Sequence, residues 1–177
     1  MRTILKNIPQ LLMACYLISC SILLAWIVIN CGSEDGDTLE HVHSSWLIHQ
    51  GKIPYKDFFQ HHNPLLWYIG APIVGMFPYS IKAVDAVNLL TVIITIITMI
   101  YIYKINKDFI SNRIGGLIDS AFYALPHDSL YNKDFKPDNY MSACLIIGIY
   151  YLFKYVKNKG LQNLVVSFML FFTAFVY

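Results

Sequence analysis

Residues that can carry out acid–base chemistry gather in one segment near the start of the chain. Between residues 34 and 62 lie five carboxylates and five of the six histidines, namely Glu34, Asp35, Asp37, Glu40, Asp57, His41, His43, His49, His61 and His62. A carboxylate can take a proton from an attacking hydroxyl or amine, and an imidazole can hold a phosphate group. Ionisable groups concentrated between apolar runs therefore predict a site of chemistry or binding.

The same residues also have ordinary structural explanations. Asp37 and Glu40 could do no more than solvate a surface helix. One of His61 and His62 could cap the helix that follows. The residue types alone leave chemistry and solvation open.

Metal binding is a third possibility for this segment. His41 and His43 have the H-x-H spacing of some metal pairs, but a helix would direct them to different faces. Asp37 and Glu40 could share a divalent cation, although two carboxylates make a small ligand set. We therefore assign no metal site and no certain cofactor from the sequence.

The composition indicates what must position these residues. The chain has 177 residues, of which 56% are hydrophobic, and its mean hydropathy is +0.50. This is too apolar for an ordinary soluble domain and predicts an all-α membrane protein with several spans. The formal net charge of +2 gives no reason to expect a nucleic-acid partner.

Apolar runs predict about five transmembrane helices within one membrane domain covering residues 1–177. They lie at residues 11–29, 83–103, 114–130, 140–155 and 161–177. A cleaved signal peptide is the alternative for the first run, but no A-x-A site follows it. The last run ends the sequence without a charged flank, so we expect a longer protein of which this is the amino-terminal part.

Residues 65–77 form a shorter apolar run, which we expect to be a re-entrant or interfacial helix. If this run does not cross, eight basic residues fall on one side of the membrane: Arg2, Lys6, Lys104, Lys107, Arg113, Lys154, Lys157 and Lys159. Lys and Arg favour the cytoplasmic side. The amino terminus is then cytoplasmic, residues 30–64 form an outer loop, and the inner membrane of a bacterium is the expected location.

The outer loop has a helical pattern over residues 37–50. In such a helix Asp37, Glu40 and His41 share a face. Gly51 is a natural stop for this helix. A fold-back of the loop would then bring Asp37 near His61 and His62 at the membrane surface.

Two blocks of residues resemble one known family. The first is D-x-x-E-H-x-H-x-x-W-L-I-x-x-G-x-x-P-Y-x-D-F-F-x-H-H-x-P-L-L-W-Y, over residues 37–68. The second is D-F-K-P-D-N, over residues 134–139. Together they resemble C-type (GT-C) membrane glycosyltransferases, closest to the protein-mannosyltransferase and aminoarabinose-transferase-like enzymes, which are similar to glycosyltransferase family 39.

The resemblance implies a GT-C-like fold, a chemistry and roles for individual residues. Enzymes of this kind transfer a sugar from a polyprenyl-phosphate donor to a lipid, glycan or protein acceptor on the extracytoplasmic face. Asp37 stands where the family has its proposed base, with Glu40 close by. His62, with His61 beside it, inherits the place of a basic residue that meets the donor phosphate, and Asp138 inherits the acidic position of the second block.

The chain also departs from the family pattern. Asn63 replaces a proline, and Lys136 replaces an arginine that would hold phosphate with two hydrogen bonds. Lys136 remains a candidate donor-phosphate ligand, and His41 and Asp57 are further candidates for the site. Many spans and an outer domain of the family are not in this sequence.

The sequence therefore predicts the amino-terminal part of a glycosyltransferase. Two alternatives stay open. One is a non-catalytic membrane protein, such as a truncated relative, a lipid-binding subunit or an assembly partner. The other is a small transporter component that uses Asp85 and Asp119, although Asp119 could instead pair with a neighbouring helix.

Overall fold

The structure is a computed structural model that describes residues 2–31, 36–124 and 133–177. Its elements are α1 (Arg2–Cys31), α2 (Gly36–His49), α3 (Leu65–Gly75), α4 (Lys82–Ile105), the π-helix η1 (Asn106–Ile110), α5 (Arg113–Ala124), α6 (Pro137–Asn158) and α7 (Leu161–Val176). The described ranges contain no strand, which confirms the predicted all-α class.

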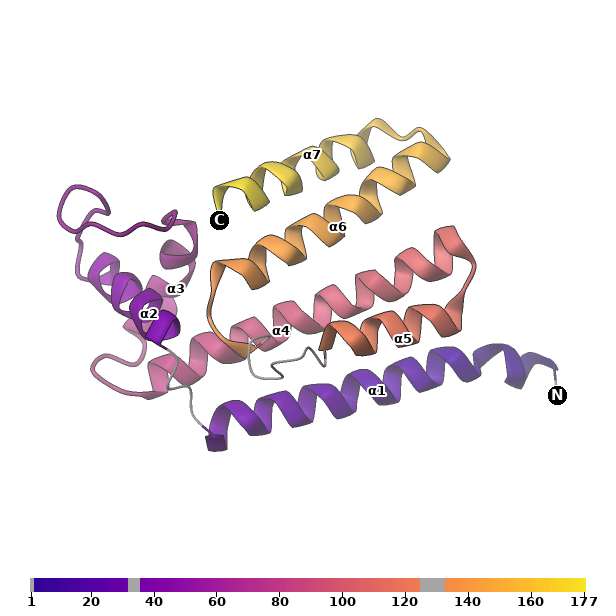
Figure 1. Cartoon of the computed structure of the whole chain (residues 1–177), viewed down its shortest axis with the longest axis horizontal. Helices are drawn as coiled ribbons and strands as arrows, with labels where there is room; N and C mark the ends of the chain where they lie inside the picture. Colours follow the sequence, from indigo (N-terminus) through magenta and orange to yellow (C-terminus); the bar gives the residue numbers. More distant parts are fainter. Residues whose placement is uncertain (1, 32–35, 125–132) are drawn as a thin grey trace.

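The helices form an elongated bundle with a smaller group of elements at one end (Figure 1). Helices α1, α4, α5, α6 and α7 run back and forth along the long axis, whereas α2, α3 and the connection between them gather at one end. Helix α4 packs against α1, α5 and α6, while α6 packs along α7 and α2 packs on α3. The end of α1 and the start of α4 therefore lie at the same end of the bundle as α2 and α3.

Within the part of the chain that the structure describes, two helical stretches are long and apolar enough to cross a membrane. They are Leu11–Asn30 in α1 and Lys82–Ile110, which joins α4 and η1. The other expected spans are present as helices, but α5 has 12 described residues and α7 has 16. At a rise of ~1.5 Å per residue, α5 extends only about 18 Å. Residues 125–130 of its expected span lie outside the described part, so the number of spans stays a prediction.

The expected re-entrant segment 65–77 contains α3. With 11 residues, α3 is about 16 Å long, which is about half of a ~30 Å hydrocarbon layer. It packs on α2 and α4 at one end of the bundle instead of running along it. Its length and position are compatible with a segment that does not cross, and entry into the lipid remains a prediction.

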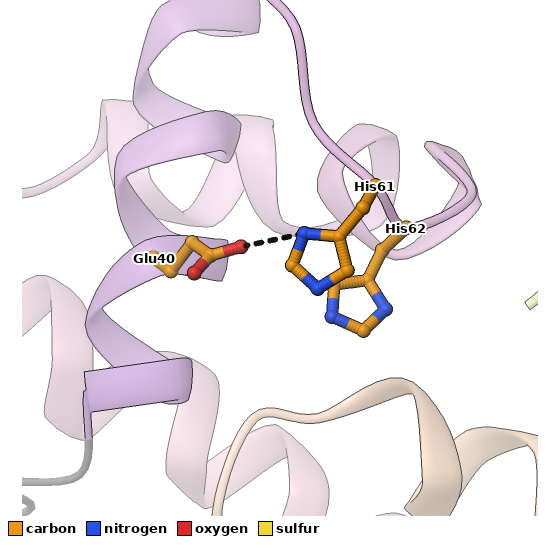
Figure 2. Close-up of side chains that lie close together, drawn as sticks. All are labelled: Glu40, His61 and His62. Atoms are coloured by element: carbon orange, nitrogen blue, oxygen red, sulfur yellow. Dashed lines mark ion pairs between the residues drawn. The ribbon is translucent and has the colours of Figure 1, made fainter.

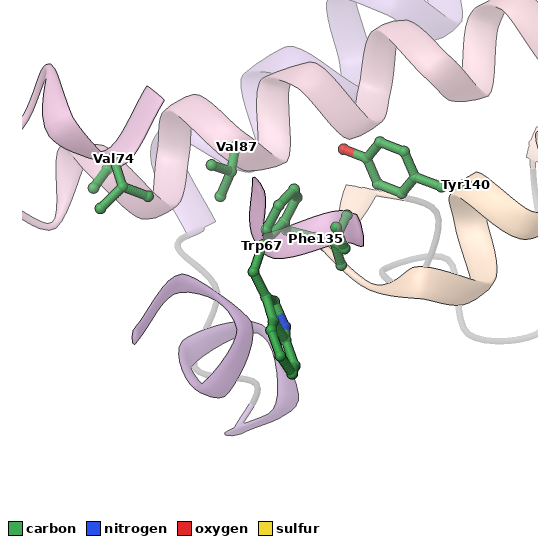
Figure 3. Close-up of a cluster of buried hydrophobic side chains, with 7 residues drawn as sticks. Trp67, Val74, Val87, Phe135 and Tyr140 are labelled. Atoms are coloured by element: carbon green, nitrogen blue, oxygen red, sulfur yellow. The ribbon is translucent and has the colours of Figure 1, made fainter. Parts of the chain in front are cut away.

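Apolar side chains from α3, α4 and the start of α6 form the core beneath α2 (Figure 3). The buried members are Leu66, Trp67, Val74, Ala83, Val87, Phe135 and Tyr140. Trp67 and Phe135 have no exposed surface. Large aromatic side chains contribute most of the stabilising energy of such cores. This cluster therefore holds α2, α3 and the connection between them onto the bundle.

Polar side chains of α4 fix the segment that leads into α6. Asn88 Oδ1 accepts a hydrogen bond from the backbone N–H of Phe135 at 3.0 Å. Thr91 Oγ1 and the Tyr140 hydroxyl are hydrogen-bonded at 3.1 Å. Because these groups are buried, each satisfied bond avoids a desolvation cost of about 1–3 kcal/mol. The segment between Phe135 and Tyr140 is thereby held over α4 at both ends.

A carboxylate expected inside the third span has a helix-pairing role. Asp119 on α5 accepts a hydrogen bond from Asn106 Nδ2 on η1 at 3.0 Å. The sequence left open whether Asp119 pairs with a neighbouring helix, and this contact is such a pairing. It joins α5 to the end of α4 through a polar pair.

Candidate functional site

Helix α2 presents a buried polar face and an exposed acidic face. Thr38, His41, Ser44 and Ser45 are buried, at spacings of three and four residues. Asp37 lies in the first turn, and its side chain is 70% exposed. The positive end of the helix dipole favours a carboxylate at that position. Helix α2 thus holds Asp37 at the surface while its other side is fixed against α3.

The end of α2 follows the sequence prediction closely. Gly51 has a φ of +80°, and its N–H donates to the carbonyl of Ile48 at 2.9 Å. Only glycine adopts this left-handed conformation without cost, so the helix stops there.

His41 is a buried neutral residue in this arrangement. Its side chain is 2% exposed, and its Nδ1 accepts a hydrogen bond from Trp67 Nε1 at 2.9 Å. Burial is the main cause that lowers the pKa of His41 to about 4, and the neighbouring His62 contributes to the same shift. Because Nδ1 is an acceptor, the proton of the neutral ring is on Nε2. His41, a candidate from the sequence, is therefore suited to positioning Trp67 and His62.

The histidine pair before α3 faces the acidic side of α2 (Figure 2). His61 Nδ1 lies 3.8 Å from Glu40 Oε1, a distance too long for a hydrogen bond but short enough for an ion pair. The rings of His61 and His62 are 4.0 Å apart, and those of His62 and His41 are 4.9 Å apart. The fold-back expected from the sequence thus brings the histidine pair to Glu40.

Asp37 meets a residue from the second sequence block. Lys136 Nζ lies 3.4 Å from Asp37 Oδ2. Lys136 is buried and extended, and it immediately precedes Pro137, the first residue of α6. Proline at that position is pre-organised for a helix start. The site therefore combines the start of α2 with the start of α6.

A buried ion pair supports the second block. Lys133 Nζ lies 3.0 Å from Asp134 Oδ1, and both side chains are at most 5% exposed. Asn139 Nδ2 also donates to the carbonyl of Asp134 at 2.8 Å. Sequence reasoning did not single out Lys133 and Asp134 as site residues. Adjacent opposite charges just before a helix-starting proline are the signal that could have found them.

Two of the sequence candidates have local roles in the structure. Asp57 Oδ2 accepts a hydrogen bond from the backbone N–H of Ile53 at 2.8 Å, which stabilises a turn in the connection between α2 and α3. Asp138 is exposed in the first turn of α6, where the helix dipole favours it. In the same connection the Tyr55 hydroxyl donates to the carbonyl of His62, so this turn helps to hold the histidine pair.

An apolar groove of about 490 Å³ lies between α2, α3 and the start of α4. Helix α2 contributes Leu39, Val42, His43 and Trp46 to its lining. These are the α2 side chains on a face other than the buried polar one. The groove gives this end of the bundle an apolar surface on a side of α2 that does not carry Asp37 or Glu40.

Residues 62–177, about two thirds of the chain, match the family described as dolichyl-phosphate-mannose-protein mannosyltransferase. No curated protein and no solved structure matches the chain. The family match begins at His62, so it includes Lys136 and leaves Asp37 and Glu40 outside. With two thirds of its length matched and its predicted resemblance confirmed, the chain belongs to the dolichyl-phosphate-mannose-protein mannosyltransferase family of membrane glycosyltransferases.

Proposed function

We propose that the chain transfers a sugar from a polyprenyl-phosphate donor to an acceptor, at the surface formed by α2, residues 60–62 and the start of α6. The description of its family names a dolichyl-phosphate-linked mannose, which supports a donor of this chemical class. The observation that carries the proposal is the placement of Lys136 Nζ 3.4 Å from Asp37 Oδ2. A cation for the leaving phosphate and a carboxylate for the acceptor then lie side by side.

In the proposed reaction Asp37 accepts a proton from the acceptor hydroxyl or amine. The acceptor atom attacks the anomeric carbon of the donor sugar, and the bond from that carbon to the phosphate oxygen breaks. The phosphate oxygen leaves with the electron pair. Asp37 is exposed on the first turn of α2, so an acceptor can reach it from the aqueous side.

Lys136 and His62 are the proposed partners of the departing phosphate. Lys136 is buried, and an ammonium attracts an anion more strongly in a partly desolvated site than in open water. His62 is held by the Tyr55 hydroxyl through its backbone carbonyl. Both residues lie within the part of the chain that matches the family.

The apolar groove supports a lipid-linked donor. It is lined by Leu39, Val42 and Trp46 of α2, which carries Asp37 on its first turn. A prenyl chain needs an apolar surface along which to lie. We propose that this groove receives a part of the prenyl chain.

The distribution of basic residues supports an extracytoplasmic site. The turn from α4 to α5 and the turn from α6 to α7 lie at the end of the bundle away from α2 and α3 (Figure 1). With the start of α1, these segments carry the eight basic residues that predict the cytoplasmic side. The proposal therefore keeps the amino terminus in the cytoplasm, the site outside, and a bacterial inner membrane as the location.

The proposal is tested by sugar transfer in membranes that contain the chain. Dolichyl phosphate mannose is the donor probe, and the measured quantity is the sugar transferred to membrane protein or lipid. We expect Asp37→Asn to lower transfer at least about 100-fold, because a positioned base contributes 10²–10⁴-fold. Asp108→Asn at the other end of the bundle is the matched control and should transfer normally. Normal transfer by Asp37→Asn would reject the assigned role.

A further inference from the structure

Three side chains at the edge of the site offer metal-ligating atoms that converge. Glu40, His61 and His62 each place one ligand atom within 4.8 Å of the other two. Figure 2 shows the His61 ring directed toward the Glu40 carboxylate, with the His62 ring beside it. Glu40 comes from α2, and the histidines come from the segment before α3, so two separate elements meet here.

One carboxylate oxygen of Glu40 lacks a hydrogen-bond partner in this cluster. Glu40 Oε1 has almost no surface of its own, yet among the described residues it has no hydrogen-bond partner. Its neighbour His61 Nδ1 lies at 3.8 Å, beyond hydrogen-bond distance. A buried carboxylate oxygen without a donor is costly. A cation between Glu40 and His61 would supply the missing partner.

One pair of ligand atoms in the cluster, Glu40 Oε1 and His61 Nδ1, lies close to the spacing of a tetrahedral metal site. Zinc lies about 2.0–2.2 Å from histidine nitrogen and carboxylate oxygen, so two ligand atoms of one tetrahedral site are about 3.3 Å apart. The Glu40–His61 separation of 3.8 Å needs to shorten by about half an ångström. The His61 side chain is 68% exposed, which leaves it free to make this movement and leaves a path for the ion.

His41 is excluded from the ligand set by its own hydrogen bond. Its Nδ1 accepts from Trp67 Nε1, so its other nitrogen holds the ring proton. It packs edge-on against His62, with ring centres 4.9 Å apart, and can orient that ring. Partners of this kind commonly fix the orientation of metal-binding histidines.

We propose that Glu40, His61 and His62 bind a divalent cation of the zinc type. Two imidazole nitrogens and one carboxylate oxygen favour zinc over magnesium, which prefers oxygen ligands. Three protein ligands leave a fourth position open. If the proposed function holds, an oxygen of the donor phosphate takes that position, and this part of the inference rests on that function.

The charges of the site explain what the cation would do. Asp37 and Glu40 carry two negative charges, and Lys136 carries one positive charge beside Asp37. These three groups sum to −1, which opposes the approach of a phosphate anion. A bound dication changes this sum to +1. The cation thus turns an acidic surface into one that can attract the donor phosphate.

Zinc binding to the purified chain tests the site directly. The chain is prepared in detergent with a purification tag that contains no histidine, and Zn²⁺ and Mg²⁺ are titrated separately by calorimetry. We expect one Zn²⁺ per chain and little binding of Mg²⁺. Glu40→Gln and His61→Ala should each weaken Zn²⁺ binding by about tenfold or more, whereas the exposed control His49→Gln should change it less than about twofold. Equal Zn²⁺ affinity in the wild type, Glu40→Gln and His61→Ala would overturn the site, as would an equal loss in His49→Gln.

A second titration separates the metal site from the proposed function. Binding of dolichyl phosphate is measured with Zn²⁺ and with a chelator, in the wild type and in Glu40→Gln. Tighter binding with Zn²⁺ in the wild type alone supports a metal that receives phosphate. Dolichyl phosphate binding that does not depend on Zn²⁺ but is lost when Lys136 is replaced overturns the role of the metal. That result leaves the proposed function intact. Zn²⁺ binding without any phosphate binding supports the metal site and rejects the proposed function.

Discussion

Lys136 Nζ lies 3.4 Å from Asp37 Oδ2, although Lys136 precedes α6 and Asp37 lies in the first turn of α2. The contact depends on two supports. Helix α2 is fixed to α3 through its buried face, and Asn88 and Thr91 of α4 hold the segment around Lys136. The two sequence blocks are therefore parts of one surface, and variants that loosen either support should disturb it.

The buried ion pair Lys133–Asp134 lies in the same segment as Lys136 and is a further support that can be tested. Asp134→Asn removes a charge from a pair whose side chains are at most 5% exposed. Breaking a buried ion pair from one side costs about 3–5 kcal/mol. We expect a clear drop in the thermal unfolding midpoint in detergent, followed by circular dichroism. The exposed Asp138→Asn is the control and should shift the midpoint much less, so equal shifts would contradict the structural role of the pair.

Gly70 tests the close packing of α3 against α2. A Cβ atom at Gly70 would lie 2.5 Å from Ser45 Oγ and 2.8 Å from Phe135 Cζ. Overpacking of this kind costs roughly 1–3 kcal/mol, so Gly70→Ala should lower the unfolding midpoint. A Cβ at Gly36, also in a helix, meets nothing within 4 Å. Gly36→Ala should therefore be neutral or slightly stabilising, and a neutral Gly70→Ala would show that α2 and α3 are not this close.

Much of the layout of the helices along the chain could be predicted from the sequence, because it depends on local patterns. Apolar runs and the stop at Gly51 predicted where most helices lie, and α2, α4, α6 and α7 are found there. Local patterns carry less information about length. The expected helix at 65–77 ends at Gly75, before the turn that leads into α4. The number of spans is not determined by hydropathy alone, since α6 is long but carries polar residues at both ends.

The site could be predicted only in part, because distant segments build it. The spacing within α2 predicted a common acidic face, and the histidine pair does lie beside it. Which partners meet was not predictable: Asp37 lies beside Lys136, and Glu40 lies beside His61. The burial of His41 also depends on Trp67, which the helical pattern of α2 cannot reveal.

His41 makes the stability of the fold depend on pH. Its pKa is lowered from 6.5 to about 4, so the folded state favours the neutral ring. The unfolded chain takes up a proton below about pH 6.5 while the folded chain does not. Stability is therefore full above that pH and falls as the pH drops toward 4, by at most about 1.4 kcal/mol per pH unit.

The matched variant for this pH effect is His41→Gln, measured without added metal. Glutamine can still accept the hydrogen bond of Trp67, but it has no proton to gain. We expect the unfolding free energy of this variant to fall less steeply between pH 6.5 and 4 than that of the wild type. Identical pH slopes would show that His41 is not buried as a neutral base.

The orientation of the bundle can be checked by cysteine labelling in a cysteine-free background. Lys56 lies in the connection between α2 and α3, and Ser111 lies in the turn between η1 and α5; both are exposed. A membrane-impermeant reagent should label Lys56→Cys in intact cells. It should label Ser111→Cys only after the membrane is opened. Labelling of Ser111→Cys from outside would place the basic end of the bundle outside and contradict the proposed topology.

The central claim is that Lys136, beside Asp37, binds the phosphate of a polyprenyl donor. The most direct measurement is the affinity of the chain, reconstituted in lipid nanodiscs, for dolichyl phosphate. Lys136→Met keeps much of the side-chain length and removes the charge, and Lys52→Met does the same at an exposed position. The account predicts a loss of about tenfold or more for Lys136→Met, as expected for a hydrogen bond to a charged group, and no change for Lys52→Met. Equal affinity of Lys136→Met and the wild type, with the helical content of both intact, would contradict it.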